Sequence, residues 1–532
     1  MTAHVDTFAR DHLPARSAWP DLLFTLPELS YPDQLNAAAV LLDEPRFAQR
    51  ACVVGDGGTW TYAELRSRAE DVAAALVDEE GLVPGNRVLL HGPNSPELIA
   101  CWFGILLAGG VVAATMPLLR AGELAKVIGK AQVSHAIADA RVAAEVRLAA
   151  EAQPVLERMR EYASGEQAFA PVAGFEAVAT DAEDVALIAF TSGTAGEPKG
   201  CVHLHRDLLA TCDTFGARVL RPREDDVFTG TPPLAFTFGL GVSVLFPMRA
   251  GASTVPIGQP SIDAVVDAIE RHAITTLSTA PTMYRAMLRD ADLSRVRSLR
   301  ACVSAGEPLP AAVATAWTER TGVRIIDGIG STEMLHIFIG SPADEARPGS
   351  VGRPVPGYEA MVVDEAMQPV APGVVGRLAV RGPTGCRYLD DPRQANYVVD
   401  GWNVTGDAFR CDEDGYFWFA ARSDDLIVSS GYNISPLEVE SALLQHDAVA
   451  ECAVVASPDE ARGNVVKAFV VASDGADAGD TLVAELQRHV KERIAPYKYP
   501  RRIEFVDALP RTLTGKVQRA VLRKREAGAA AV

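Results

Sequence analysis

The sequence has few of the features that mark secreted, nucleic-acid-binding or membrane proteins. Its eight cysteines are scattered along 532 residues without a Cys-x-x-Cys pair. Neither a zinc motif nor a dense disulfide framework is indicated, and a reducing, cytoplasmic compartment is expected. Basic residues are in the minority, with 50 Lys+Arg against 69 Asp+Glu and a net charge of −19. Broad binding to nucleic acid or to an anionic membrane surface is therefore disfavoured.

One apolar run, from Leu98 to Leu119, carries no charge and is long enough to cross a bilayer. The pair Gly109-Gly110 divides it into a helix-length half and a strand-like half, the pattern of a buried helix followed by a strand. Its flanks lack the Lys/Arg bias that orients a membrane span. We therefore expect no membrane partner.

Apolar residues make up 48% of the chain, enough to form large cores. Between about Trp60 and Val255, helical patterns alternate with short β-branched runs, which predicts parallel sheets covered by helices. Short strand-like pieces at 349–422 predict a small β subdomain, and helix–strand alternation then returns. The predicted fold class is α/β (α+β), with a large N-terminal domain at 1–423 and a smaller α+β domain at 424–532.

The most informative segment runs from Phe190 to Gly200 and reads FTSGTAGEPKG. Its glycines expose backbone N–H groups, its hydroxyls add hydrogen-bond donors and Lys199 adds a positive charge, a combination that suits a polyphosphate. It is not a Walker A loop, because Gly-Lys-Ser/Thr does not occur at the required spacing. On composition alone, a flexible surface turn explains the segment equally well.

Seven further motifs favour the phosphate loop, because together with it they resemble the adenylate-forming acyl- and aryl-CoA synthetase superfamily in order and approximate spacing. They are Pro233-Leu-Ala-Phe236, Ala305-Gly-Glu-Pro308, Gly328-Ile-Gly-Ser-Thr-Glu333, Thr405-Gly-Asp407, Arg422-Ser-Asp-Asp425, Ser430-Gly-Tyr-Asn433 and Thr514-Gly-Lys516. The first 190 residues also resemble the family, so the resemblance covers essentially the whole chain.

The resemblance implies an enzyme that joins a carboxylate to AMP with release of pyrophosphate, using ATP, Mg²⁺ and coenzyme A. Because two anions meet in that reaction, the site needs positioned cations and hydrogen-bond donors. The implied catalytic residues are Thr332 at the α-phosphate, Glu333 as the metal ligand, and Lys516, which bridges carboxylate, phosphate and ribose. The implied nucleotide contacts are Thr191, Ser192, Gly193, Thr194, Lys199, Ala305, Gly306, Glu307, Asp327, Gly328, Ile329, Asp407 and Arg422.

The family works in two steps, and between them the small C-terminal domain rotates to replace Lys516 with a tunnel for the thiol. Asp424 matches the hinge of that rotation. Ser430, Gly431 and Tyr432 match the loop that lines the coenzyme A tunnel.

Departures from the common pattern indicate the branch. Where the family usually has Tyr-Gly, with the ring on adenine, this sequence has Ile329-Gly330, so adenine stacking must come from a weaker contact. The run DGIGSTEMLHI at 327–337 resembles benzoate-type aryl-CoA ligases, and PPLAFTFGLG at 232–241 is similar more narrowly to 2-aminobenzoate–CoA ligases. The candidates for the aryl pocket are Phe236, Thr237, Phe238, Gly239, Gly330, His336 and Ile337.

The implied activity converts an aromatic acid, first of all 2-aminobenzoate, to aryl-AMP and then to aryl-CoA, in a monomer or homodimer. Two alternatives stay open. One is an enzyme that loads salicylate or benzoate onto a carrier protein, and the other is a non-catalytic nucleotide-binding module. The presence of Glu333, Asp407 and Lys516 disfavours the second alternative.

Three histidines have competing interpretations. His336 either orients the carboxylate or an ortho substituent of the acid, or is a buried core residue. His203 and His205 lack a nearby Cys or acidic ligand, so we expect them at the start of the helix after the phosphate loop and not in a metal site.

Charge is uneven along the chain, since residues 491–525 hold eleven Lys or Arg against three Asp or Glu. In isolation such a cluster suggests nucleic acid. Placed around Lys516, it is interpreted as the basic face that a mobile domain brings to the phosphates of ATP and coenzyme A.

Overall fold

The chain forms two compact units in the computed structural model. The described residues are 2–55, 57–163, 168–191, 197–422, 425, 427–429, 432–459, 463–473, 475–494, 496–511 and 517–529. Unit 1 comprises Met1–Ala360 and Val380–Asn403, and unit 2 comprises Met361–Ala379 and Val404–Val532.

Unit 1 contains a six-stranded sheet whose strands are parallel except at one edge, where β7 and β8 form an antiparallel hairpin. Side chains from both faces of its strands are buried, as expected for a parallel sheet covered by helices on both sides. In order across the sheet, the strands are β6 (Arg158–Tyr162), β5 (His135–Asp139), β3 (Arg87–His91), β4 (Val111–Thr115), β7 (Val185–Thr191) and β8 (Lys199–Leu204).

An eight-stranded sheet forms the second layer system of unit 1 and is parallel through its centre, with antiparallel pairs at its two edges. In order, its strands are β14 (Ile337–Gly340), β13 (Ile325–Gly330), β12 (Ala301–Ser304), β11 (Thr276–Thr279), β9 (Val227–Gly230), β10 (Ser253–Thr254), β1 (Ala51–Gly55) and β2 (Gly58–Thr61).

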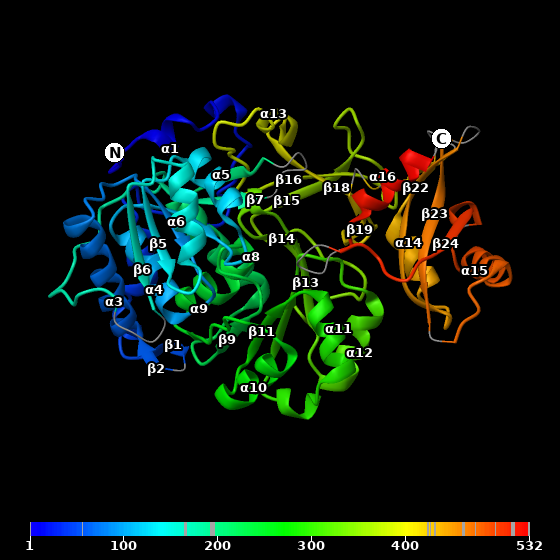
Figure 1. The fold of residues 1–532 in the computed structure, drawn as a ribbon, viewed down its shortest axis with the longest axis horizontal. Helices are drawn as coiled ribbons and strands as arrows, with labels where there is room; N and C mark the ends of the chain where they lie inside the picture. The colour runs from blue at the N-terminus through cyan, green and yellow to red at the C-terminus, as the bar shows by residue number, and fades with distance from the viewer. Residues whose placement is uncertain are drawn as a thin grey trace. The chain divides into compact units, whose positions relative to one another are not determined.

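Helices cover these sheets and bury apolar side chains against them (Figure 1). Leu124, Val127 and Ile128 of α5 pack with Leu89 of β3, and Trp317 of α12 packs with Leu277 of β11. The helices of unit 1 are α1 (Phe8–Asp11), α2 (Ala37–Leu42), α3 (Tyr62–Ala74), α4 (Pro96–Leu107), α5 (Ala121–Ala131), α6 (Ala143–Ala152), α7 (His205–Thr211), α8 (Thr237–Leu240), α9 (Phe246–Ala250), α10 (Ile262–His272), α11 (Pro281–Asp290), α12 (Ala311–Thr321) and α13 (Gln394–Tyr397).

The apolar run at 98–119 folds as its sequence predicts, into most of α4 followed by β4. Gly109 between them has a φ of +73°, a left-handed conformation that glycine adopts at little cost. In the part of the chain that the structure describes, no helix is long and apolar enough to cross a membrane.

The β-rich region after residue 349 contains a five-stranded sheet, as predicted, and one short helix, α13. The division between the two units falls within this region. Its strands are β15 (Glu359–Val363), β16 (Gly376–Arg381), β18 (Trp402–Cys411) and β17 (Val398–Val399), with β19 (Phe417–Arg422) paired to β18.

The C-terminal part of unit 2 has its own apolar core between a three-stranded sheet and two helices. Val454 and Val470 from the sheet pack there with Val439 of α14 and Leu486 of α15. The elements are β20 (Ile427–Ser429), β21 (Tyr432–Ile434), α14 (Pro436–Leu443), β22 (Val449–Asp459), β23 (Gly463–Ala472), α15 (Asp480–Arg493), β24 (Arg502–Phe505) and α16 (Arg519–Ala529). The predicted α/β class is confirmed by this architecture.

Candidate active site

The predicted phosphate loop at 190–200 includes the end of β7 and the start of β8 in unit 1. Thr191 ends β7 and faces Lys199, the first residue of β8, in the strand register. The ammonium of Lys199 donates to the hydroxyl of Tyr388 at 3.0 Å. Ser192, Gly193 and Thr194 lie outside the described residues, so their predicted phosphate contacts stay predictions.

Thr332 and Glu333 sit in a single 3₁₀ turn, η8 (Thr332–Met334), directly after β13. Ser331 begins the turn by accepting a hydrogen bond from the Met334 N–H. Leu335 ends the turn with a φ of +68°. This conformation is unfavourable for a bulky side chain, and here the buried surroundings of Leu335 hold it in place. The chain therefore reverses between Glu333 and His336.

Two side chains outside the predicted set hold this turn in place. His203 Nε2 donates to the Thr332 carbonyl oxygen at 2.8 Å, and the Tyr388 hydroxyl donates to Glu333 Oε1 at 2.5 Å. Burial lowers the pKa of His203 to about 4, so the ring is neutral near pH 7. We name Lys199, Tyr388, Glu333 and Thr332 the polar half of the site.

The expectation for His203 was wrong in one respect. His205 does begin helix α7, but His203 lies two residues earlier, within strand β8. Both side chains are fully buried.

Asp327 lines a cavity of about 300 Å³ in unit 1, between α12 and the segment at 346–352. Its Oδ1 has no hydrogen-bond partner of standard geometry among the described residues. Burial raises the pKa of Asp327 well above its usual range, although the Gly328 N–H and the Ser304 hydroxyl oppose that shift. The role of Asp327 in binding the nucleotide stays a prediction.

Gly306 and Glu307 come just after the C-terminal end of β12 in the eight-stranded sheet. Gly306 has a φ of +88°, and nothing lies within 4 Å of the position that a Cβ would take. Glu307 accepts a hydrogen bond from the Thr282 hydroxyl at 2.6 Å. Ala305 is buried, while Gly328 and Ile329 pair with β14 through Gly340 and Ile339.

His336 lies among aromatic rings on the other side of the Leu335 reversal. Its ring centroid is 4.6 Å from that of Phe246, 5.3 Å from Phe215 and 5.8 Å from Phe238. Neither ring nitrogen has a hydrogen-bond partner of standard geometry among the described residues. Burial lowers the pKa of His336 to about 3, and the nearby Phe238 backbone does not offset it. We name these four side chains the aromatic half.

The remaining aryl-pocket candidates divide into exposed, buried and close-packed positions. Phe236 is 39% exposed and Thr237 is buried at the start of α8. A Cβ on Gly239 would lie 2.1 Å from the Pro233 carbonyl oxygen, and one on Gly330 would lie 2.6 Å from that of His336. Both glycines therefore allow close backbone approach. The last candidate, Ile337, pairs with Gly330 across β13 and β14.

In unit 2, Asp407 of β18 and Arg422 of β19 are partners in the strand register, and their expected role at the ribose stays a prediction. The Asp407 N–H donates to the Thr405 hydroxyl at 3.3 Å. Tyr432 belongs to β21. Asp424, Ser430, Gly431 and Lys516 lie outside the described residues.

The basic segment at 491–525 is largely balanced by acidic partners within unit 2. Arg519 pairs with Glu440 at 2.7 Å, Arg511 with Glu451 at 2.7 Å, and Arg525 with Glu504. Further ion pairs of this segment are Lys498–Glu438, Arg502–Asp459 and Arg523–Asp425. Six of the eleven basic residues thus already have acidic partners, and the interpretation of this segment as a basic face for the phosphates stays a prediction.

Two family models match this chain. The model of the AMP-binding enzyme matches residues 43–387, and that of the AMP-binding enzyme C-terminal domain matches 438–516. The chain belongs to the AMP-binding enzyme family. It is 37% identical to the benzoate–CoA ligase of Thauera aromatica over 514 residues. The matched region covers 94% of this chain and 98% of that protein.

Solved structures of the family agree with this membership. The anthranilate CoA ligase AuaEII in complex with anthranoyl-AMP is 36% identical with a TM-score of 0.88, over 95% of this chain and all of that one. A benzoate CoA ligase from Burkholderia xenovorans LB400 is 34% identical with a TM-score of 0.81, over 92% and 99%. The expected resemblance, and the expected class of acid–thiol ligase, are confirmed.

Glu333 fits the Mg²⁺ that the motifs of an AMP-binding enzyme imply. Its Oε1 is bonded to Tyr388, while Oε2 makes no hydrogen bond with a described residue. Among those same residues, no three His, Cys, Asp or Glu side chains form a metal-binding group. Mg²⁺ commonly binds through one or two carboxylates and substrate phosphates, so one such carboxylate is enough. The ion would supply positive charge to the phosphate oxygens.

Proposed function

We propose that this AMP-binding enzyme is an aryl-acid–CoA ligase and that its preferred acid is 2-aminobenzoate. The products are aryl-CoA, AMP and pyrophosphate, formed through an enzyme-bound aryl-AMP. The similarity to benzoate and anthranilate CoA ligases supports the class of acid. The aromatic half supports the preference for an ortho amino substituent on the ring.

The observation that carries the proposal is the state of His336. A neutral imidazole buried among three phenylalanine rings, with no hydrogen-bond partner of standard geometry among the described residues, is costly unless something in the functional cycle bonds to it. An aromatic acid with an ortho amino group brings a flat ring for the phenylalanines and a polar group for the imidazole. Plain benzoate also fits the rings but brings no ortho group to bond the imidazole.

The polar half suits the first half-reaction. A carboxylate oxygen attacks the α-phosphorus and the bond to pyrophosphate breaks, so negative charge grows on the phosphoryl oxygens. Lys199, with Thr191, Ser192, Gly193 and Thr194, is assigned to the β- and γ-phosphates, and Thr332 to the α-phosphate. Glu333 is assigned to the metal.

The remaining assignments follow from the family motifs. Asp407 and Arg422 would bind the ribose, and Lys516 would bridge carboxylate, phosphate and ribose. In the second half-reaction the thiol of coenzyme A attacks the aryl-AMP carbonyl and AMP leaves. We assign that step to a rotation of the domain at 424–532 about Asp424, with Ser430, Gly431 and Tyr432 along the thiol tunnel.

The nearest alternative keeps the adenylation step and changes the acceptor. An aryl-acid adenylating enzyme would pass salicylate or benzoate to a carrier protein and would not consume free coenzyme A. We place the ligase first because its relatives include CoA ligases at nearly full length. We further propose that the enzyme works in the cytoplasm, as a monomer or homodimer.

A pyrophosphate-release panel tests the proposal. The acids are benzoate, 2-aminobenzoate, salicylate, phenylacetate and octanoate, each assayed with and without coenzyme A. We expect 2-aminobenzoate to have the highest kcat/KM and coenzyme A to permit many turnovers with formation of the thioester. A site that hydrogen-bonds the ortho group separates 2-aminobenzoate from benzoate by about 10⁴, whereas an apolar one does so by about 10–200-fold. Octanoate as the best substrate, or turnover indifferent to coenzyme A, would contradict the proposal.

A further inference from the structure

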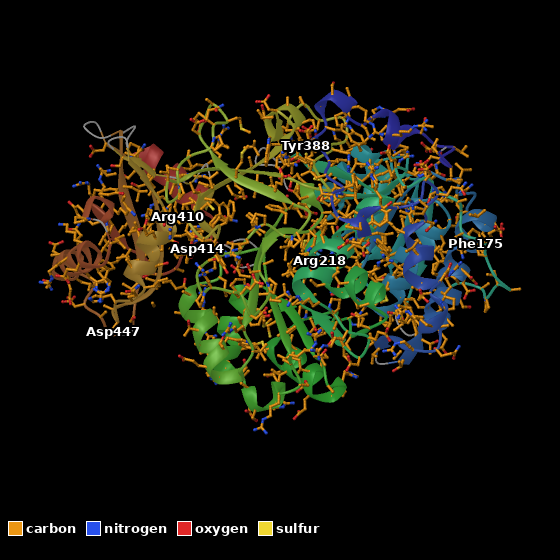
Figure 2. The ribbon with its side chains drawn as sticks, turned by 180° about the vertical axis from the view of Figure 1, so that it is seen from behind. Phe175, Arg218, Tyr388, Arg410, Asp414 and Asp447 are labelled. Atoms are coloured by element: carbon orange, nitrogen blue, oxygen red, sulfur yellow. The ribbon has the colours of Figure 1, made fainter. Side chains whose placement is uncertain are left out.

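Tyr388 lies between the two oppositely charged side chains of the polar half. Its hydroxyl donates to Glu333 Oε1 at 2.5 Å and accepts from Lys199 Nζ at 3.0 Å. Figure 2 labels Tyr388 on the segment that connects β16 to α13. The side chain is 1% exposed, so water does not compete for these bonds.

The backbone around Tyr388 is fixed along strand β8, the strand that begins with Lys199. The Leu389 N–H donates to the Gly200 carbonyl oxygen, and the Val202 N–H donates to that of Arg387, each at 2.8 Å. Hydrogen bonds on both sides of Tyr388 thus hold it in a constant register against the phosphate-loop hairpin.

Buried side chains secure the same segment. Arg387 and Asp207 form an ion pair at 2.6 Å, and both side chains are fully buried. The Tyr388 N–H donates to Gln394 Oε1 at 2.9 Å, while Gln394 Nε2 donates to the Cys386 carbonyl oxygen at 3.1 Å. The position of the hydroxyl is therefore set by the fold and not by the ligand.

A neutral phenol at this point changes what its two neighbours can do. The hydroxyl donates to Glu333 Oε1, so it carries its proton and adds no charge between the two side chains. Without the hydroxyl, the part-buried ammonium of Lys199 and the buried carboxylate of Glu333 would attract each other and form a direct ion pair. That pair would occupy the charges that phosphate and metal need.

We propose that Tyr388 is a positioning residue that separates Lys199 from Glu333, leaving the ammonium for the phosphates of ATP and a carboxylate oxygen for Mg²⁺. This inference rests on the proposed function, because it assigns those two ligands to those two side chains. It deepens that function by naming a residue that touches neither ligand and acts through both charged groups.

The test compares Tyr388→Phe with the wild type in two measurements. The first is ATP binding by calorimetry, in EDTA and in saturating Mg²⁺. The second is the Mg²⁺ dependence of ATP–pyrophosphate exchange. We expect the Mg²⁺-dependent gain in ATP affinity to fall about tenfold, the scale of one hydrogen bond to a charged group. The KM for the acid should stay within about twofold.

Tyr62→Phe is the matched control. Tyr62 is also fully buried, and among the described residues its hydroxyl bonds the carbonyl oxygens of Pro247 and Ala252 and its ring lies beside Phe47, none of which is assigned to the site. A loss of stability without any change in Mg²⁺ dependence is the result expected of a merely structural tyrosine.

A double-mutant cycle with Glu333→Gln gives the mechanism a second test. If Tyr388 acts through Glu333, its replacement by Phe has little further effect on Mg²⁺-dependent binding in that background. An equal effect in both backgrounds, or a Tyr388→Phe enzyme with wild-type Mg²⁺ dependence, would overturn the inference. If Tyr388→Phe does not fold, Tyr388→His keeps a ring donor. It must then require at least threefold more Mg²⁺ than the wild type, and an unchanged requirement also overturns the inference.

The outcomes separate this inference from the proposed function. If no carboxylate supports pyrophosphate exchange in the wild type, the proposed function fails before any variant is compared. If exchange occurs in the wild type and the Tyr388 variants have the same Mg²⁺ dependence as the wild type, the assignment of Tyr388 fails and the proposed function stands.

Discussion

Glu333 of the polar half and His336 of the aromatic half are three residues apart in the sequence and have opposite surroundings. Glu333 has a hydroxyl at 2.5 Å, with an ammonium beyond it. His336 has three phenylalanine rings and no hydrogen-bond partner of standard geometry in the described part of the chain. The reversal at Leu335, with a φ of +68°, lies between them.

This difference teaches that one short turn can supply two kinds of recognition. A charged, hydrogen-bonded environment suits phosphates and a cation, whereas a flat apolar one suits an aromatic ring. A strained turn is the local cost of directing adjacent residues into such different surroundings. The proposed reaction needs both environments next to each other, because the ring's carboxylate must reach the α-phosphorus.

The largest expected effect comes from the polar half. Glu333→Gln keeps the shape of the side chain and removes the charge assigned to Mg²⁺. We expect adenylate formation to slow by about 10²–10³, the range for removing one charge-stabilising group from an active site. ATP–pyrophosphate exchange measures it, and the KM for the aryl acid should hardly change. A variant that keeps the wild-type rate, or that loses only acid affinity, would show that the halves do not divide the work in this way.

A smaller effect is expected at Gly241, whose backbone lies against the ring of His336. A Cβ on Gly241 would lie 2.3 Å from Cδ2 of His336, so Gly241→Ala must displace the ring. We expect a loss of about 1–3 kcal/mol in the free energy of unfolding, the usual cost of overpacking. The KM for the acid should rise and that for ATP should not. Gly122→Ala is the control, because nothing lies within 4 Å of its Cβ position.

The aromatic half should also make the protein sensitive to acid. His336 has a folded-state pKa of about 3 against an ordinary value of 6.5, so the unfolded chain binds a proton between these values that the folded chain does not. The free energy of unfolding therefore falls as the pH drops below about 6.5. His336→Phe should make that fall shallower by up to about 1.4 kcal/mol per pH unit. Urea unfolding between pH 7 and 4.5 measures the slope, and identical slopes for both proteins would contradict the buried neutral histidine.

The smallest effect concerns adenine. Ile329→Tyr restores the ring that the family usually has at this position. We expect the KM for ATP to fall by up to about tenfold, because an aromatic contact contributes about 0.5–1.5 kcal/mol. The KM for the acid is the internal control. Weaker ATP binding would mean that the space above Ile329 is already filled by another contact.

Sequence patterns predicted the architecture well, because strand and helix periodicity and glycine punctuation are local signals. Leu98–Leu119 shows this best, since its glycine pair marked the change from α4 to β4. Motif spacing also indicated Glu333 and Lys199. It did not indicate Tyr388 or His203, which act on those residues through hydrogen bonds between distant segments. Such contacts have no period and no fixed spacing, so only the folded chain reveals them.

The charge pattern shows the same limit. Eleven basic residues at 491–525 form a clear signal in the sequence. Their partners, such as Glu440 for Arg519 and Glu451 for Arg511, come from other elements of unit 2. Counting charges along the chain cannot show which ones the fold has already paired.

The most direct test of the account is to detect the product of the first half-reaction on the enzyme. Enzyme, ATP, Mg²⁺ and 2-aminobenzoate are mixed without coenzyme A, quenched with acid and analysed by mass spectrometry. The account predicts 2-aminobenzoyl-AMP at close to one equivalent per active site, with pyrophosphate, and its conversion to the coenzyme A thioester and AMP when coenzyme A is added before the quench. Release of ADP and phosphate in place of AMP and pyrophosphate, or an adenylate that coenzyme A does not discharge, would contradict it.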